Sequence, residues 1–133
     1  MEAKVILKYK KYTLSQLKEK ATTKFNQFIR ERDYGNCCIS CGQPTELQAG
    51  HFYSGGNYPA LKFFETNVHG QCMKCNYYLS GNLLEYRKNL ANKIGVDALN
   101  ALDEVAAQCK RVSFKWDRFR LIEIIEKYLK LKL

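Results

Sequence analysis

Apolar side chains recur every three or four residues over the first part of the chain, which is the spacing of an amphipathic α-helix. Thr13 and Gln16 stand three residues apart just before this pattern, as in a capping box at a helix start. The apolar positions are Leu14, Leu17, Ala21, Phe25, Phe28 and Ile29. The pattern predicts a helix over residues 14–32, preceded by a basic N-terminal arm over residues 1–12.

The central part of the chain lacks this period. Glycine, asparagine and proline interrupt residues 35–44, and such interruptions predict a turn-rich knuckle. The runs 47–53 and 60–64 are compatible with β-strands, and Ser54-Gly55-Gly56-Asn57 between them has the composition of a loop. We therefore predict that these two runs form a loose β-hairpin.

Helical periodicity returns after the hairpin. It predicts a short helix that begins near Cys72 and stops before Ser80, followed by helices over residues 82–95, 97–111 and 113–128. Asn82 and Ser113 can cap the helices that they begin, and Gly95 can adopt the conformation that a helix C-terminus requires.

Together these elements predict an α+β fold in which a ββα core is flanked by N-terminal and C-terminal helices. We expect residues 13–95 to form the core with its N-terminal helix, and residues 96–133 to form a helical extension. Both belong to one compact unit, because a chain of 133 residues has material for a single hydrophobic core.

Basic side chains are concentrated at the two ends of the chain. Residues 1–32 carry nine basic and three acidic side chains, residues 110–133 carry eight and three, and residues 33–109 carry five and seven. Basic flanks suit a polyanion such as DNA, although they also serve solubility. The side chains expected to contact phosphates are Arg87, Lys110, Arg111, Lys115, Arg118 and Arg120. Of these, Arg87 has an ordinary surface arginine as its equal alternative.

No apolar run approaches the ~18 residues of a membrane span. The charged residues Glu2 and Lys4 argue against a signal peptide. We therefore expect a cytoplasmic protein with no membrane partner. Cysteines seldom form disulfides in a reducing cytosol, so clustered cysteines are better interpreted there as metal ligands.

Two C-x-x-C pairs, at residues 38–41 and 72–75, are separated by 30 residues. Each pair can offer two thiolates to one edge of a tetrahedral ion, which predicts a structural Zn²⁺ bound by Cys38, Cys41, Cys72 and Cys75. Four sulfur ligands leave no open position for substrate, so this zinc would hold the fold rather than perform chemistry. Cys37 could replace Cys38 with a longer spacing, and Cys109 is predicted to be a core residue.

The chain's only two histidines, His51 and His69, lie between the halves of this cysteine set, together with Asn67. The succession C-x-x-C, G-H-F, N-x-H-x-Q-C-x-x-C-N and S-G-N resembles the NinG/Rap family of phage recombination nucleases, and more widely the His-Me finger (HNH-type) enzymes. The resemblance covers roughly residues 12–95. It includes Ile29-Arg-Glu-Arg-Asp33 before the first knuckle and Tyr86-Arg87 after the second.

The resemblance implies a role for each of these polar residues. Phosphodiester hydrolysis needs a base for water and a cation for the phosphate; by resemblance, His51 is the general base and Asn76 binds a catalytic Mg²⁺ or Mn²⁺. Asn67 is similar to the asparagine that buttresses the active-site loop. His69 has three interpretations: a second metal ligand, a phosphate contact, or a hydrogen-bonded structural imidazole. Gly50 departs from the pattern, because many relatives have aspartate there as a second ligand.

The resemblance further implies a phage- or prophage-encoded endonuclease, acting in the bacterial cytoplasm on branched DNA such as D-loops and Holliday junctions. Cutting two strands is simplest with two copies of the chain. A homodimer interface could use Phe114, Trp116, Phe119, Ile122 and Ile125, which could equally be core. The alternatives are a non-catalytic zinc module that binds nucleic acid, and a His-Me finger that has lost its activity.

Overall fold

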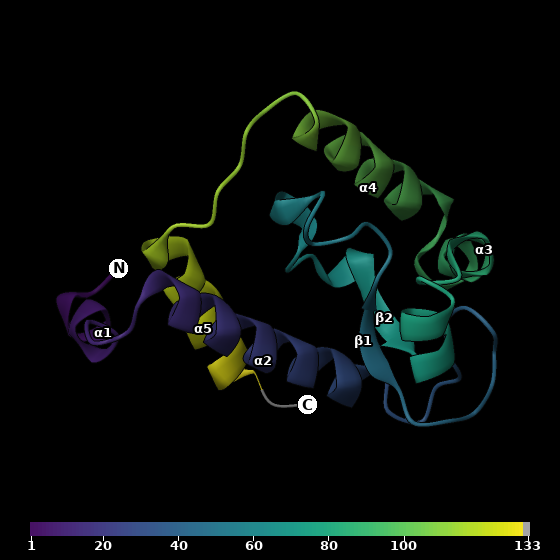
Figure 1. Ribbon diagram of the computed structural model, residues 1–133, viewed down its shortest axis with the longest axis horizontal. Coiled ribbons are helices and arrows are strands. Elements are labelled where there is room, and N and C mark those ends of the chain that lie inside the picture. Colours follow the sequence, from purple (N-terminus) through teal and green to yellow (C-terminus); the bar gives the residue numbers. More distant parts are fainter. Residues whose placement is uncertain (132–133) are drawn as a thin grey trace.

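The computed structural model describes residues 1–131 as a mostly helical α+β fold with one two-stranded sheet (Figure 1). Its elements are α1 (Ala3–Lys8), α2 (Leu14–Arg32), β1 (Gln48–His51), the 3-10 turns η1 (Pro59–Leu61) and η2 (Glu65–Asn67), β2 (Val68–Gln71), the π-helical turn η3 (Lys74–Tyr78), α3 (Leu83–Ile94), α4 (Val96–Cys109) and α5 (Arg118–Lys130). Among these residues no helix has the length and apolar character that crossing a membrane requires.

The helix α2 begins and ends where the periodicity predicted. Thr13 Oγ1 accepts a hydrogen bond from Gln16 N at 3.2 Å, and Gln16 Oε1 accepts one from Thr13 N at 2.9 Å. This reciprocal capping box satisfies two amide groups that the first helical turn would otherwise leave without partners. The short helix α1 lies within the predicted N-terminal arm.

The sheet pairs β1 with a later segment than predicted. Gln48 lies opposite Gln71 and Gly50 lies opposite His69 in the antiparallel pair β1–β2. The prediction of a second strand over residues 60–64 is wrong, because these residues belong to η1 and the turn that follows it. Pro59 explains the difference: its fixed φ suits the first residue of a helical turn, where its lack of an N–H costs nothing.

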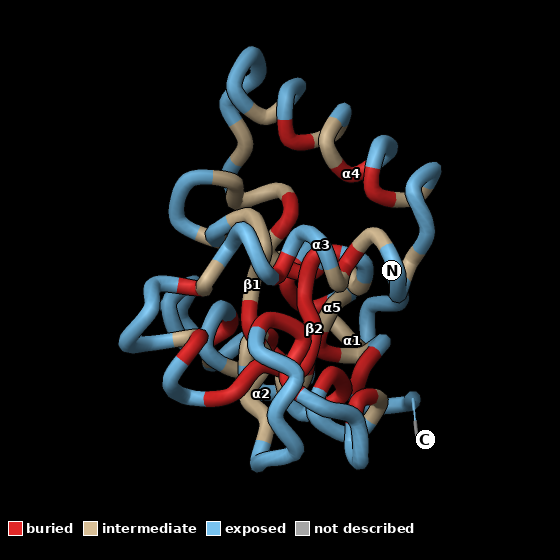
Figure 2. Tube along the Cα trace, turned by 90° about the vertical axis from the view of Figure 1, so that its right-hand side faces the viewer, coloured by how far each residue is buried: buried red, intermediate tan, exposed pale blue. Residues whose placement is uncertain are grey.

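Two helical layers enclose the hairpin, and each has its own apolar core (Figures 1 and 2). On one side α2 and α5 pack against each other and against the buried side chains of Phe63 and Val68. On the other side α3 and α4 pack around Leu61 and Tyr86. The Tyr86 hydroxyl also donates a hydrogen bond to Gly50 O at 2.7 Å, which ties α3 to β1.

The helix α3 begins where predicted but lacks the expected side-chain cap, and α5 begins later than predicted. Asn82 precedes α3, but its side chain makes no cap; its Nδ2 donates instead to Cys75 Sγ. The helix α5 begins at Arg118 rather than after Ser113, because the Asp117 carboxylate accepts a hydrogen bond from Arg120 N at 2.9 Å. Gly95 ends α3 with a φ of 90°, as its predicted role requires.

The inner face of α5 belongs to the core of the chain. Ile122 and Ile125 are buried against α2, so they are not available to a dimer interface. Trp116 is half-buried, and its Nε1 donates to Pro59 O at 2.8 Å. Of the apolar residues that the sequence offered for an interface, Phe114 is also half-buried, and only Phe119 is exposed.

Candidate metal centre and active site

Four cysteines from two parts of the chain meet at one point. Cys38 and Cys41 precede β1, Cys72 and Cys75 follow β2, and their Sγ atoms all lie within 4.8 Å of one another. Cys41 Sγ and Cys72 Sγ are 3.7 Å apart. Sulfurs bound at ~2.3 Å to one tetrahedral ion lie roughly 3.8 Å apart, whereas a disulfide needs about 2.05 Å. The predicted pairing of the C-x-x-C motifs is confirmed, and its geometry fits a zinc site. Cys37 lies outside the cluster.

The surroundings of the cluster shift the pKa values of its thiols in opposite directions. Cys72 N donates to Cys38 Sγ at 3.3 Å, and Asn82 Nδ2 donates to Cys75 Sγ at 3.5 Å. Burial raises the pKa of Cys38, but N–H groups, including those of Cys41 and Cys72, outweigh it and lower this pKa to about 7. Burial raises the pKa of Cys75 to about 12, with neighbouring thiols acting in the same direction. Four sulfurs this close could all ionise only with a cation among them, as in a zinc site.

His51 is the last residue of β1, and its imidazole is half-buried. Its Nε2 lies 2.9 Å from Lys62 O. A carbonyl oxygen can only accept, so Nε2 carries the proton and Nδ1 keeps its lone pair. Burial lowers the pKa of His51, the carbonyl contact raises it, and the Lys62 ammonium lowers it, with a net decrease. The imidazole is therefore neutral at neutral pH and has an unprotonated nitrogen for use as a base.

Asn76 lies in η3, directly after the cluster residue Cys75. Its Nδ2 donates to Gln48 Oε1 at 2.9 Å. Gln48 begins β1 and His51 ends it, so both candidate groups are attached to one strand, at positions about 10 Å apart along it. The hydrogen bond orients the Asn76 amide and leaves its Oδ1 as an oxygen donor of the kind that Mg²⁺ and Mn²⁺ accept.

Asn67 is fully buried at the end of η2, directly before β2, and holds the loop between the strands. Its Oδ1 accepts from Tyr53 N at 2.8 Å, and its Nδ2 donates to Tyr53 O at 2.9 Å and to Leu61 O at 3.1 Å. These bonds fix the path of the chain on both sides of His51's partner Lys62. They support the expected role of Asn67 as a loop buttress.

His69 is buried, and both of its ring nitrogens have partners. Nε2 lies 2.9 Å from Thr66 O, and Nδ1 lies 3.1 Å from Arg32 Nη2. Burial, with help from the Lys93 charge, lowers the pKa of His69 to about 4. Of the three interpretations of this residue, the contacts favour the neutral, hydrogen-bonded structural imidazole.

A buried ionic network that the sequence did not reveal connects α2 to β2. Asp33 Oδ2 accepts from Gly70 N at 2.7 Å and pairs with Lys93 at 2.9 Å, while Arg32 Nη2 donates to Val68 O at 2.7 Å. Burial raises the pKa of Asp33, but hydrogen bonds from Arg32, Gly70 and Lys93 hold it well below its usual range. The Arg32-Asp33 dipeptide was part of the family resemblance, yet its partners lie more than 30 residues away in the chain.

The space beside Gly50, where the resemblance implied an aspartate as a second metal ligand, is filled by a neighbouring side chain. A Cβ atom at Gly50 would lie 2.0 Å from Gln71 Oε1 and 2.8 Å from Gln71 Cβ. Gln71 is fully buried, and its Nε2 donates to Ser40 Oγ at 2.8 Å and to Gly81 O at 2.6 Å. The Gln71 carboxamide therefore occupies the place that an acidic side chain at position 50 would need.

Adding a methyl group at this position is expected to destabilise the protein. Gly50→Ala should lower the free energy of unfolding by ~1–3 kcal/mol, the usual cost of overpacking a filled site. Urea unfolding of the zinc-loaded protein measures the effect. Gly56→Ala is the matched control, because a Cβ at Gly56 meets nothing within 4 Å. Equal losses in the two variants would contradict the steric argument.

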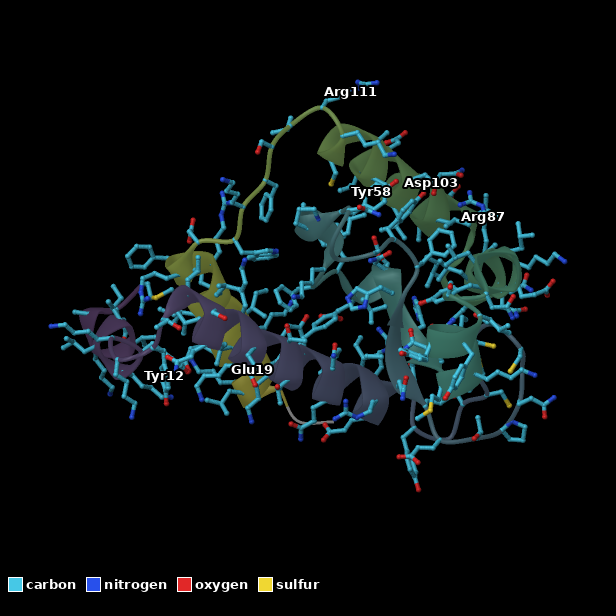
Figure 3. All side chains as sticks on the ribbon, viewed as in Figure 1. Tyr12, Glu19, Tyr58, Arg87, Asp103 and Arg111 are labelled. Carbon is cyan, nitrogen blue, oxygen red and sulfur yellow. The ribbon has the colours of Figure 1, made fainter. Side chains whose placement is uncertain are left out.

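Arg87 is engaged in an ion pair between α3 and α4. Its Nη2 and Nη1 donate to the two carboxylate oxygens of Asp103 at 2.7 and 3.1 Å, and Asp103 also accepts from the Tyr53 hydroxyl. Figure 3 shows Arg87 and Asp103 side by side. The guanidinium lies 5.8 Å from the centre of the Phe52 ring. In this structure Arg87 thus links α3 to α4 through its ion pair with Asp103.

The other expected phosphate contacts lie in or next to the connection between α4 and α5. Arg111 projects outward from it (Figure 3), and Lys115 is exposed. Three have partners within the chain: Lys110 lies over the Tyr58 ring, Arg118 donates to Tyr9 O, and Arg120 lies near Asp117. These contacts leave Arg111 and Lys115 as the most accessible cations of the set.

A four-cysteine cluster beside a two-stranded hairpin, with helical layers on both sides, defines an α+β protein with a candidate metal centre. The model of a family described as "Bacteriophage Lambda NinG protein" matches residues 2–132. The chain belongs to the NinG family, as the sequence motifs suggested.

Relatives in this family are each named "Protein ninG". The protein of Escherichia phage 933W is 36% identical over 124 residues, which are 86% of this chain and 60% of that protein. The protein of Salmonella phage P22 is 42% identical over 81% of this chain and 51% of that protein. The protein of Escherichia phage lambda is 41% identical, with shares of 75% and 48%. The chain thus spans about half of the length of these relatives. No solved structure matches it.

Proposed function

We propose that this protein is a metal-dependent DNA endonuclease of the His-Me finger type that cuts branched recombination intermediates such as D-loops and Holliday junctions. The observation that carries the proposal is the state of His51: its Nε2 is bonded to Lys62 O, its Nδ1 has no hydrogen-bond partner within residues 1–131, and its pKa is lowered. The proposal includes zinc at the four cysteines and Mg²⁺ or Mn²⁺ at Asn76. It also includes a bacterial cytoplasmic location and two copies acting on one junction.

In the proposed reaction, His51 Nδ1 takes a proton from water while the water oxygen attacks phosphorus. The bond from phosphorus to the leaving oxygen breaks, and that oxygen receives a proton from solvent. The carbonyl of Lys62 keeps the imidazole oriented and stabilises the positive charge that it acquires. A divalent cation at Asn76 Oδ1 would neutralise charge on the phosphate and on the leaving oxygen.

The proposal places a requirement on where DNA binds. Regular alternation along β1 directs the side chains of Gln48 and His51 to opposite faces of the sheet. The scissile ester must therefore lie at the edge of the hairpin, where His51 and the Asn76 amide are both within reach. Arg111 and Lys115 would contact flanking phosphates. Arg87 would join them only if its pair with Asp103 opened.

A non-catalytic zinc module that binds nucleic acid is the second candidate. The observation in its favour is the Gln71 carboxamide beside Gly50, which excludes an acidic metal ligand at that position. In that case Asn76 and His51 would have structural roles only, and the protein would bind DNA without cutting it.

Cleavage assays with synthetic DNA separate the two candidates. Purified protein is incubated with a four-way junction, a D-loop and a linear duplex, each with Mg²⁺, Mn²⁺ or no added divalent ion. We expect metal-dependent nicking of the branched substrates, and we expect Asn76→Ala to need a higher metal concentration. Asn92→Ala, an exposed asparagine of α3, serves as the control. If the wild type cuts none of the three with either metal, the non-catalytic module is favoured.

A further inference from the structure

An unusual concentration of exposed apolar side chains lies on η3 and at the start of α3. We name it the η3 patch, and it consists of Met73, Tyr77, Tyr78, Leu79, Leu83 and Leu84. The side chains of Tyr77 and Tyr78 are 75% and 71% exposed, and their ring centres lie 5.1 Å apart. Within residues 1–131 neither hydroxyl makes a hydrogen bond. Contiguous apolar surface of this kind usually marks a site of interaction.

The backbone beneath the two rings is held firmly. Cys75 is a member of the thiolate cluster, and its carbonyl accepts a hydrogen bond from Gly81 N at 2.7 Å. Leu79 N donates to Lys74 O at 2.9 Å, which closes a π-helical turn, a form that is rare and frequent at functional sites. In Figure 1 this turn lies beside β2 and below α3. The rings are therefore presented on a fixed base, directly after Asn76 in the chain.

The charge of the surrounding chain favours a polyanion as the occupant. Residues 47–84 contain one acidic residue, Glu65, and its carboxylate is paired with Lys127 at 3.4 Å and with the Tyr128 hydroxyl at 2.7 Å. Lys74 adds an exposed positive charge within η3. Glu85, which directly follows the patch residue Leu84, is paired with Lys88 at 3.1 Å. A surface that combines exposed aromatic rings with few unpaired acidic groups suits nucleic acid, whose bases have apolar faces and whose backbone is negative.

We propose that Tyr77 and Tyr78 form a stacking platform for unpaired bases. Base pairs in a continuous duplex hide their faces by stacking on one another, so only unpaired nucleotides can use the platform. Branched DNA has such nucleotides where strands separate, which gives a physical basis for preferring it. The inference rests on the proposed function in taking DNA as the substrate. It adds the residues that distinguish branched DNA from duplex.

Binding measurements without added Mg²⁺ or Mn²⁺ test the platform independently of cleavage. The probes are a short single-stranded oligonucleotide that contains 2-aminopurine, whose fluorescence falls on stacking, and a hairpin duplex with the same number of phosphates. We expect Tyr77→Ala/Tyr78→Ala to bind the single strand roughly 5- to 100-fold more weakly and to lose the quenching. Duplex affinity should be unchanged. Tyr77→Phe/Tyr78→Phe should behave as the wild type, since stacking needs only the ring.

Tyr34→Ala is the control, because Tyr34 is 88% exposed, follows α2 in the chain and is not a member of the η3 patch. Zinc content verifies that each variant is folded. Quenching of 2-aminopurine fluorescence by the wild-type protein tests base stacking without any variant. Equal weakening for single strand and duplex, or no weakening, would overturn the platform. A fall from dimer to monomer in sedimentation, with single-strand affinity unchanged, would overturn it in favour of a second copy of the chain. If the binding pattern holds but no DNA is cut, only the catalytic proposal fails.

Discussion

Replacing His51 by alanine is expected to slow cleavage of a four-way junction by ~10²–10⁴-fold, the usual contribution of a general base. The imidazole is only half-buried and makes a single hydrogen bond, to Lys62 O, so the fold should survive the change. Zinc content and affinity for the junction should therefore stay close to those of the wild type. Single-turnover rates at saturating metal measure the effect, because they exclude product release from the comparison.

The pH dependence of the cleavage rate is an independent test of His51 as the general base. A base works only when it is unprotonated, so the rate should fall as pH falls through the pKa of His51. Burial lowers this pKa below the ordinary value of 6.5, so the rate should hold down to a lower pH than an ordinary histidine would allow. His51→Ala should remove this acidic limb of the profile.

The second histidine provides the contrast. His69→Gln should reduce stability, because His69 is buried between Arg32 and Thr66, while leaving the chemical step nearly unchanged once the protein is folded. A His51→Ala variant that cuts at close to the wild-type rate would show that the base lies elsewhere. In that case the free Nδ1 of His51 would have no catalytic meaning.

The parts of this fold that the sequence predicted are those set by local chemistry. The capping box of Thr13 and the apolar stripe that follows it define α2 without help from the rest of the chain. The cysteine cluster was predictable for a similar reason, since each pair, such as Cys72 and Cys75, has the spacing of metal ligands. The family resemblance then supplied the proposed roles of His51 and Asn76, which spacing alone does not give.

The parts that were missed depend on distant partners. The β2 segment has no alternation of apolar and polar residues, because all four of its residues are buried and its polar side chains, such as His69, are bonded to buried partners. Gly70 and Val68 are bonded to Asp33 and Arg32, a contact across more than 30 residues that no local pattern reveals. The start of α5 was misplaced because Ser113 and Asp117 are both good caps, and only the structure distinguishes them.

Removal of the cluster metal should have a larger effect on stability than any other change considered. Among the described residues, the hydrophobic cluster of Cys38, Cys72 and Cys75 has Leu47 as its only further apolar contact, so apolar packing contributes little where the knuckle meets η3. Besides a metal, hydrogen bonds such as that from Gln71 Nε2 to Ser40 Oγ hold the knuckle in place. Structural zinc contributes roughly 10–16 kcal/mol in small zinc-bound peptides, and whole domains have only about 5–15 kcal/mol of net stability. Cys72→Ser or a strong chelator should therefore unfold the hairpin region.

The two helical layers make this expectation specific. The core between α2 and α5 and the core between α3 and α4 share no buried residue with the cysteine cluster. The metal-free protein should thus keep much of its helical circular dichroism while losing a cooperative part of its urea transition. Cys37→Ser and Cys109→Ser are matched controls, because both residues lie outside the cluster. Each of these variants should retain one zinc ion per chain. An undiminished urea transition after complete zinc loss would contradict the role of the metal, and Asn76 would then need another anchor beside β1.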